Sequence, residues 1–330
     1  MIDLTASYMG LRLRNPLIVA SCDLTRDVDD VLRCQEAGAG AVVLKSIFEE
    51  EFLVKDALGQ SDYQIHPEAV DYLRSRGLLE YAPSKIVKVI EEAKAKAKIP
   101  IIASINCQSP QLWPRYAQQL EQAGADGIEL NIYFLPVDPE IESSSYEAHH
   151  VQILKEVREK VSIPVAVKLT YQFTSLPHLA SKLADNGCDG LVLFNWFLEP
   201  DIDINNLKTK VIRGKANFYQ SLKWIALLAG RIDCELASSG GLNKAEDLVK
   251  QILAGASAVQ AASLFYQKGL KAIEEIIQGL KAWMREHDFT HIDDFRGELS
   301  FKEQELSFKS LGEAEAYFRA QYLKLYKGFE

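Results

Sequence analysis

Apolar and polar positions along the chain fall into alternating blocks with the lengths of strands and helices. One phrase occurs four times, in which a helical pattern ends at a glycine and a short turn leads into an apolar run: AGAGAVVLK at 37–45, AGADGIELN at 123–131, NGCDGLVLF at 186–194 and AGASAVQAA at 254–262. A glycine at a helix end followed by an apolar run is typical of a helix that leads into a buried parallel strand. The four phrases therefore predict four strands of a parallel sheet.

Four further apolar runs predict four more strands, at 16–21, 99–106, 163–170 and 234–239. Helical periodicity fills the intervals between the strands. Eight strands that alternate with helices favour a closed (β/α)8 barrel, the TIM-barrel fold. An open, doubly wound sheet is the alternative that the same alternation allows.

Two connections that follow predicted strands are longer than simple loops, at 47–83 and 196–216. Loops after strands build the catalytic face of such a barrel, so we expect both to lie over a substrate. Oligomer contacts are the alternative role for them. The residues from about 287 onward follow the last helix of the barrel, and we predict that they form a packed extension. Residues 1–330 are then a single domain.

The formal net charge of −9 argues against a nucleic acid as the partner, because binding to a phosphate backbone needs a clustered positive surface. No apolar run approaches the roughly 18 residues that a membrane span requires, and no secretory signal pattern stands at the start of the sequence. The five cysteines contain no C-x-x-C pair and are odd in number, which favours a reducing compartment over disulfides or zinc. We therefore predict a cytoplasmic protein with a small-molecule substrate and no metal.

Polar residues stand where the predicted strands end. The set comprises Ser21, Lys45, Ser46, Asn106, Asn131, Lys168, Asn195, Ser239 and Ser263. A single asparagine at such a place commonly caps a turn, and a single lysine is commonly solvated or ion-paired. Two lysines and three asparagines at equivalent heights of one barrel predict instead a polar ligand over its mouth.

The end of the seventh predicted strand has the sequence Ser239-Gly240-Gly241, and the eighth ends at Ala262-Ser263. Loops after these two strands are the usual phosphate site of this fold, where backbone N–H groups and helix N-termini favour an anion. A Gly-Gly pair elsewhere often does no more than allow a tight turn. At this place in the barrel we interpret it as a phosphate site.

Lys168 follows the apolar run VAV on a predicted buried strand. Burying an unpaired ammonium group is costly, so we expect Lys168 to face an electron-rich partner such as a ring carbonyl or an anion. A reduced flavin is a partner of this kind, because negative charge accumulates on its pyrimidine end.

With these residues in place, the chain resembles the dihydroorotate dehydrogenase family, in particular its soluble, FMN-containing class. The likeness covers nearly the whole chain, from YMGLRLRNPLIVASCDLT through AGAGAVVLKS, AGADGIELN, IPVAVKLT and SSGGL to DFRGELS. It implies an FMN oxidoreductase that passes hydride between a carbon–carbon bond and flavin N5, with a place in pyrimidine biosynthesis. A cytoplasmic homodimer is implied by the same resemblance.

The resemblance also assigns the residues that hold the cofactor. It implies that the flavin ring and ribityl chain are surrounded by Ala20, Ser21, Lys45, Ser46, Asn106, Asn131, Lys168 and Asn195. It implies that the phosphate is held by Gly240, Gly241, Ala262 and Ser263, next to Ser239.

The sequence departs from the family in its catalytic loop, which in the family has an Asn, two residues and then Cys-Pro-Asn. Asn131 is present, but Phe134 stands in place of the proton-transferring Cys and Pro136 in place of the second Asn. Trp196 stands where the family has a hydroxyl residue. Tyr133, Phe134 and Trp196 together predict a flatter, more apolar substrate pocket than orotate needs. The chain is then a divergent member, and its substrate is either dihydroorotate or a different small molecule.

Two residues near the predicted mouth are candidates to move a proton, Tyr133 and Cys107. The alternatives are that Tyr133 is an aromatic wall of the pocket and that Cys107 is a small buried filler. Without such a group, the protein is a non-catalytic flavin-binding protein or a partner subunit. A flavin-free barrel that binds a phosphorylated metabolite is the third interpretation.

Overall fold

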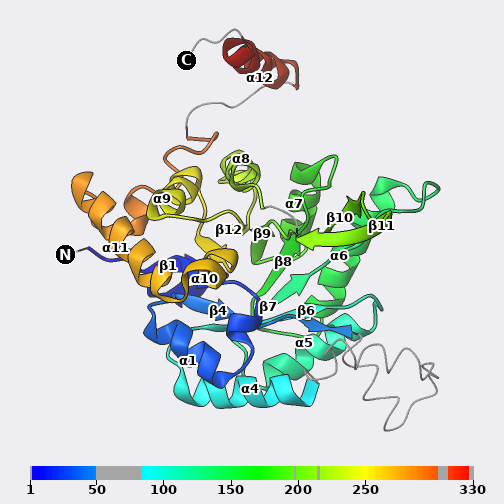
Figure 1. Ribbon diagram of the computed structural model, residues 1–330, viewed down its shortest axis with the longest axis vertical. Coiled ribbons are helices and arrows are strands. Elements are labelled where there is room, and N and C mark those ends of the chain that lie inside the picture. The colour runs from blue at the N-terminus through cyan, green and yellow to red at the C-terminus, as the bar shows by residue number, and fades with distance from the viewer. Residues whose placement is uncertain (1, 50–82, 197, 214–215, 304–310, 327–330) are drawn as a thin grey trace.

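Eight parallel strands of the computed structural model close into a barrel (Figure 1), and the structure describes residues 2–49, 83–196, 198–213, 216–303 and 311–326. The strands are β3 (Leu17–Val19), β4 (Ala41–Val43), β6 (Ile101–Asn106), β7 (Gly127–Asn131), β8 (Val165–Leu169), β9 (Gly190–Leu193), β12 (Glu235–Ser239) and β13 (Ala258–Ala261). β13 pairs with β3, and β4 pairs with both β3 and β6, which closes the circle. The predicted (β/α)8 barrel is confirmed, and the open sheet is wrong.

Helices surround the barrel and follow its strands in turn. They are α1 (Val28–Glu36), α4 (Pro83–Lys96), α5 (Leu112–Gln122), α6 (Ser143–Arg158), α7 (Leu176–Asp185), α8 (Phe218–Leu228), α9 (Ala245–Ala254) and α11 (Lys271–Glu286), with the short α10 (Ser263–Lys268) before α11. Each long helix buries one face. In α5 that face is Trp113, Tyr116, Ala117 and Leu120, at the helical spacing that packs one stripe onto the strands.

An N-terminal hairpin covers the end of the barrel where the strands begin. It consists of β1 (Ala6–Tyr8) and β2 (Leu11–Leu13), and its residues Tyr8, Met9 and Leu13 pack among the inward side chains of the strands. A Cβ atom on Gly190 would lie 2.8 Å from Tyr8 Oη, so the close approach of the hairpin requires glycine there. Ligand access is therefore expected at the opposite end, where the strands end.

The structure describes most of one long connection and only the start of the other. Residues 196–216 contain an antiparallel hairpin of β10 (Leu198–Asp203) and β11 (Lys208–Arg213). The connection predicted at 47–83 begins with β5 (Ile47–Phe48), which pairs with the end of β6, and its residues 50–82 lie outside the described residues.

After α11 the chain returns to the barrel. Residues around the 3-10 helix η3 (Ile292–Asp294) pack there, with Phe295 fully buried. Helix α12 (Leu311–Tyr326) stands away from the barrel body in Figure 1, and its Phe318 ring lies 5.8 Å from that of Phe301. The single-domain organisation stays a prediction. Among the described residues, no helix has both the length and the apolar character to span a membrane.

Candidate active site

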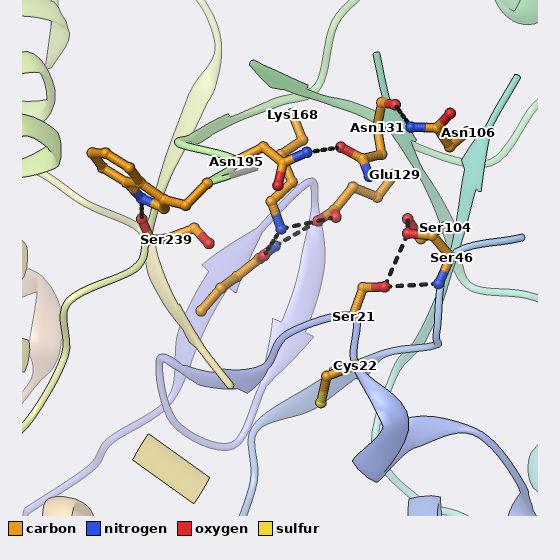
Figure 2. A network of polar contacts seen from close by, with 12 residues as sticks. Ser21, Cys22, Ser46, Ser104, Asn106, Glu129, Asn131, Lys168, Asn195 and Ser239 are labelled. Carbon is orange, nitrogen blue, oxygen red and sulfur yellow. Dashed lines mark hydrogen bonds and ion pairs between the residues drawn. The ribbon is translucent and has the colours of Figure 1, made fainter. Parts of the chain in front are cut away.

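A buried polar cluster lies inside the barrel below its mouth (Figure 2). Lys168 Nζ on β8 is 3.4 Å from Glu129 Oε1 on β7 and 3.2 Å from Gln260 Oε1 on β13. Gln260 Nε2 donates a hydrogen bond of 2.6 Å to Glu129 Oε2. All three side chains are buried, so each polar group depends on the other two for its partner. The electron-rich partner predicted for Lys168 is, within the chain itself, a carboxylate and an amide carbonyl.

The three asparagines predicted for the site meet above this cluster. Asn106 Nδ2 donates to the backbone carbonyl of Asn131 at 2.9 Å, and Asn195 Nδ2 donates to Asn131 Oδ1 at 2.6 Å (Figure 2). Asn131 is thereby held by Asn106 at the end of β6 and by Asn195 just after β9. Because its Oδ1 is engaged, the side-chain donor Nδ2 is the group that it can offer to a ligand.

A chain of hydroxyl groups joins the ends of three strands on the other side of the mouth. Ser21 Oγ accepts a hydrogen bond from the backbone N–H of Ser46 at 2.7 Å, and the two hydroxyl oxygens are 2.9 Å apart. Ser46 Oγ is in turn 2.7 Å from Ser104 Oγ on β6. Ala20 sits just before this chain, and its N–H donates to the carbonyl of Ala261. The network holds the Ser21 and Ser46 side chains in place.

The two predicted lysines differ in height. Lys45 Nζ lies 2.5 Å from Asp23 Oδ1, and its side chain is 30% exposed, against 8% for the side chain of Lys168. Lys45 therefore lies at the rim of the mouth and Lys168 in its floor. Next to this rim, the backbone N–H of Asp23 donates to Tyr266 Oη of α10 at 2.7 Å.

Neither Tyr266 nor the nearby Cys22 is suited to be a base. Burial raises the pKa of Tyr266 to about 12, and the thiol of Cys22 adds to that shift. Burial also raises the pKa of the Cys22 thiol above its usual value. Both groups therefore carry their protons at neutral pH.

The predicted phosphate residues stand at two neighbouring strand ends, since β12 pairs with β13. Gly240 and Gly241 have φ angles of +94° and +83°, the left-handed region that favours glycine. Ala262 precedes α10 and Ser263 is its first residue. These residues thus follow two adjacent strands, and their role in binding a phosphate stays a prediction.

Trp196 forms a wall beside Gly240. Its Nε1 donates to the carbonyl of Ser239 at 3.2 Å, and its ring stacks on that of Tyr171 with centroids 5.1 Å apart. A Cβ atom on Gly240 would overlap the indole. Trp196 is therefore fixed by a hydrogen bond, a stacked ring and a bare backbone.

The residues that follow Asn131 lie in different surroundings. The Phe134 ring lies 4.7 Å from that of His149 and 5.5 Å from that of His150, both on α6, so it faces this helix. Tyr133 is half-buried between Asn131 and Phe134, and Cys107 is buried directly after β6. Roles for Tyr133 and Cys107 in proton transfer stay predictions.

Three polar residues of the site were not predicted from the sequence: Ser104, Glu129 and Gln260. Each lies within an apolar strand, two positions before a residue that the sequence did single out, namely Asn106, Asn131 and Ala262. Side chains two apart on a strand share a face. A polar residue at that spacing was therefore the signal that could have found them.

Comparisons with known proteins place the chain in one family. The family model described as dihydroorotate dehydrogenase matches residues 3–284. The chain is 30% identical to the catalytic subunit of dihydroorotate dehydrogenase B (NAD(+)) from Pyrococcus horikoshii, over 89% of this chain and 97% of that protein. The subunit of the same name from Thermoplasma acidophilum is 27% identical, over 90% of this chain and 99% of that protein.

Proposed function

This chain belongs to the dihydroorotate dehydrogenase family, and on that premise we propose that it is an FMN-dependent oxidoreductase acting on a carbon–carbon bond of a small molecule. The observation that carries the proposal is the polar floor and rim of the barrel mouth. Lys168 lies beneath three asparagines, two of which donate hydrogen bonds to the third. Bare glycine backbone stands at the end of β12, which is the neighbour of β13. This donor set suits a planar, carbonyl-rich ring that carries a phosphate tail.

The residues proposed to hold FMN divide between its two ends. The residues proposed to surround the ring and ribityl chain are Ala20, Ser21, Lys45, Ser46, Asn106, Asn131, Lys168 and Asn195. The residues proposed to hold the phosphate are Ser239, Gly240, Gly241, Ala262 and Ser263. An ammonium group has three donor hydrogens, and the contacts of Lys168 with Glu129 and Gln260 engage two of them. The third is available to a ring carbonyl above. FMN, when bound, supplies the ring that exchanges hydride with the substrate at N5.

The substrate side of the mouth supports a substrate other than dihydroorotate, the compound after which the relatives are named. Phe134 faces α6, and Trp196 is stacked on Tyr171. Phe134 has no polar group, and the one polar hydrogen of Trp196, on Nε1, is donated to the carbonyl of Ser239. We assign proton transfer to the hydroxyl of Tyr133, with Cys107 as the second candidate. A phenol acts as a general acid when its oxygen reaches the reacting carbon or a water on it.

The first experiment asks whether the purified protein is yellow, and whether colourless protein takes up FMN and quenches its fluorescence. We expect a flavin absorption band. Protein that stays colourless after incubation with FMN contradicts the proposal and favours a barrel that binds a phosphorylated metabolite.

The second experiment follows the flavin band after anaerobic mixing with a reduced substrate. Dihydroorotate is expected to leave the band unchanged on the time scale of turnover. With a compound that does bleach it, Tyr133→Phe is expected to slow bleaching about hundredfold, the usual size of a general-acid contribution. Tyr171→Phe, which keeps its stacking on Trp196, is the matched control and should retain the rate.

A non-catalytic flavin-binding protein or partner subunit is the second candidate. Phe134 at the position of the family's proton-transferring residue favours it. This candidate predicts a bound flavin that no CH–CH compound reduces, whereas the oxidoreductase predicts that one class does. We further propose a cytoplasmic homodimer.

A further inference from the structure

A second cavity lies beside the barrel mouth, outside the residues proposed for the flavin. It has a volume of about 220 Å³ and lies between the loop after β7, the first turns of α6 and the loop after β8. Its walls include Phe134, Ile141, Tyr146, Thr170 and Phe173, and the side chain of His150 forms part of its lining. Apolar and aromatic side chains thus share the lining with polar ones, which include Ser143, Gln172 and the imidazole of His150.

The His150 side chain offers a fixed hydrogen-bond acceptor. Its residue is only 3% exposed, and its Nδ1 lies 2.7 Å from the backbone carbonyl of Tyr146. A carbonyl oxygen only accepts, so Nδ1 carries the hydrogen. Burial lowers the pKa of His150 to about 4, which keeps the ring neutral near pH 7. A neutral imidazole with hydrogen on Nδ1 has its lone pair on Nε2.

Nothing else in the described part of the chain uses that lone pair. His150 makes no hydrogen bond there beyond the one from Nδ1. Two phenylalanine rings contact the imidazole edge-on, Phe134 at 5.5 Å and Phe173 at 5.2 Å between centroids, and they hold its orientation. An acceptor that borders a cavity is satisfied by water or by a ligand that donates to it, and a donating ligand that displaces the water keeps the hydrogen bond.

The negative charge of the lining excludes anionic ligands. Asp138 and Glu147 contribute to the wall, and the described residues that line the cavity include no Lys or Arg. A carboxylate or phosphate group would meet two negative charges and a lone pair without a compensating cation. The ligand is therefore neutral or carries a weak positive charge.

The size and the walls narrow the choice further. A buried cavity of about 150 Å³ in another protein holds benzene, so a cavity of about 220 Å³ has room for two fused rings. Aromatic walls favour flat aromatic ligands through edge and stacking contacts. We propose that this cavity is a binding site for a small, neutral, bicyclic heteroaromatic molecule whose N–H donates to His150 Nε2. The proposal does not depend on flavin.

The test compares two probes of the same shape, indole and benzofuran, in NMR titrations of the full-length protein. Benzofuran has an oxygen where indole has its N–H. Indole is expected to bind about tenfold more tightly, the usual effect of one hydrogen bond to a buried acceptor. His150→Phe removes the acceptor while keeping a ring, and it should weaken indole about tenfold and leave benzofuran unchanged. His149→Phe, whose side chain also contacts the ring of Phe134, is the control and should bind both probes as the wild type does.

Three results would overturn the proposal. They are equal affinity of the wild type for both probes, unaltered indole binding by His150→Phe, and binding of indole-3-carboxylate as tight as that of indole. The comparison of probes on the wild type needs no variant, so it decides the matter even where His150→Phe fails to fold. A protein that binds indole but takes up no FMN would contradict the proposed function and leave this site standing.

Discussion

Lys168 Nζ and Glu129 Oε1 lie 3.4 Å apart in the interior of the barrel, where both side chains are almost completely buried. An ion pair in such a place costs desolvation energy that only its own partners can offset, so removing one member is more damaging than removing both. Loss of one member of the pair therefore lowers the stability of the barrel, and Lys168 is also the residue that we place beneath the flavin.

The first prediction follows from that asymmetry. Glu129→Gln keeps the shape of the side chain but leaves the ammonium of Lys168 without a counter-ion, and we expect the free energy of unfolding to fall by about 3 kcal/mol. The double variant Glu129→Gln/Lys168→Met should recover most of this loss. Urea unfolding of the wild type and both variants measures the difference, and a single variant as stable as the wild type would contradict the role of the pair.

The second prediction concerns the contact between Trp196 and Gly240. Gly240→Ala introduces a methyl group at a φ of +94° and into the space of the indole, so we expect a loss of about 2 kcal/mol in stability. Trp196→Ala removes the overlap with the indole, but it leaves the contact with Ala216 Cβ at 2.8 Å and the backbone strain. In the Gly240→Ala background it should therefore restore part of the loss, and thermal unfolding of the four proteins measures the coupling. Strictly additive effects would show that the contact is not the cause.

Much of this architecture follows from the sequence. Each helix that ends at glycine before an apolar run, as at Gly124 and Gly187, leads into a strand of the barrel. Because parallel strands end at one side of the barrel, Asn106, Asn131 and Asn195 were expected to meet, and they do.

Two physical reasons explain why other features of the structure could not be predicted from the sequence. Glu129 and Gln260 lie in apolar runs, and the hydrophobic pattern of a buried parallel strand does not mark which positions face inward. The cavity beside His150 arises from two loops and a helix start that are remote in sequence, and no local pattern records such packing. The covering of the barrel by the β1–β2 hairpin is non-local for the same reason.

The third prediction concerns Tyr8 in that hairpin. Its hydroxyl is buried and has no hydrogen-bond partner within the described residues, and burial raises its pKa well above the usual value. Tyr8→Phe removes a hydroxyl that is desolvated without compensation, so we expect the protein to become more stable by about 1 kcal/mol. Tyr8→Ala instead removes the ring and should destabilise it by about 3 kcal/mol or more. Urea unfolding distinguishes these outcomes, and a loss of stability in Tyr8→Phe would point to a partner such as buried water.

The fourth prediction tests the proposed homodimer. The β10–β11 hairpin exposes three apolar side chains near its turn, Ile202, Ile204 and Leu207. Exposed apolar groups gathered on one element are typical of an interaction surface. We expect Leu207→Asp to shift the protein from dimer to monomer in analytical ultracentrifugation. Leu299→Asp, at an exposed leucine of the C-terminal segment, should leave the dimer intact. A wild type that is monomeric at all concentrations would contradict the proposal.

The fifth prediction concerns pH and the buried imidazole of His150. Its pKa is about 4 in the folded chain because burial disfavours the charged form and the neighbouring His149 adds to the shift, against 6.5 as the ordinary value. The carboxylates of Asp138 and Glu147 line the same cavity. Between these two pKa values the unfolded chain binds a proton that the folded chain does not, so stability falls as the pH is lowered from 6.5 towards 4.

The loss of stability that His150 causes at low pH is large enough to measure. His150 should contribute a loss of about 2 kcal/mol between pH 7 and pH 5. Urea unfolding at both values should give a smaller loss for His150→Phe than for the wild type, by about that amount, because phenylalanine takes up no proton. His149→Phe is the matched control, since it changes the adjacent residue of α6 and leaves His150 in place, and its loss of stability should exceed that of His150→Phe. An equal pH dependence of the wild type and His150→Phe would mean that the folded chain takes up the proton on His150 as readily as the unfolded chain does, which contradicts the lowered pKa.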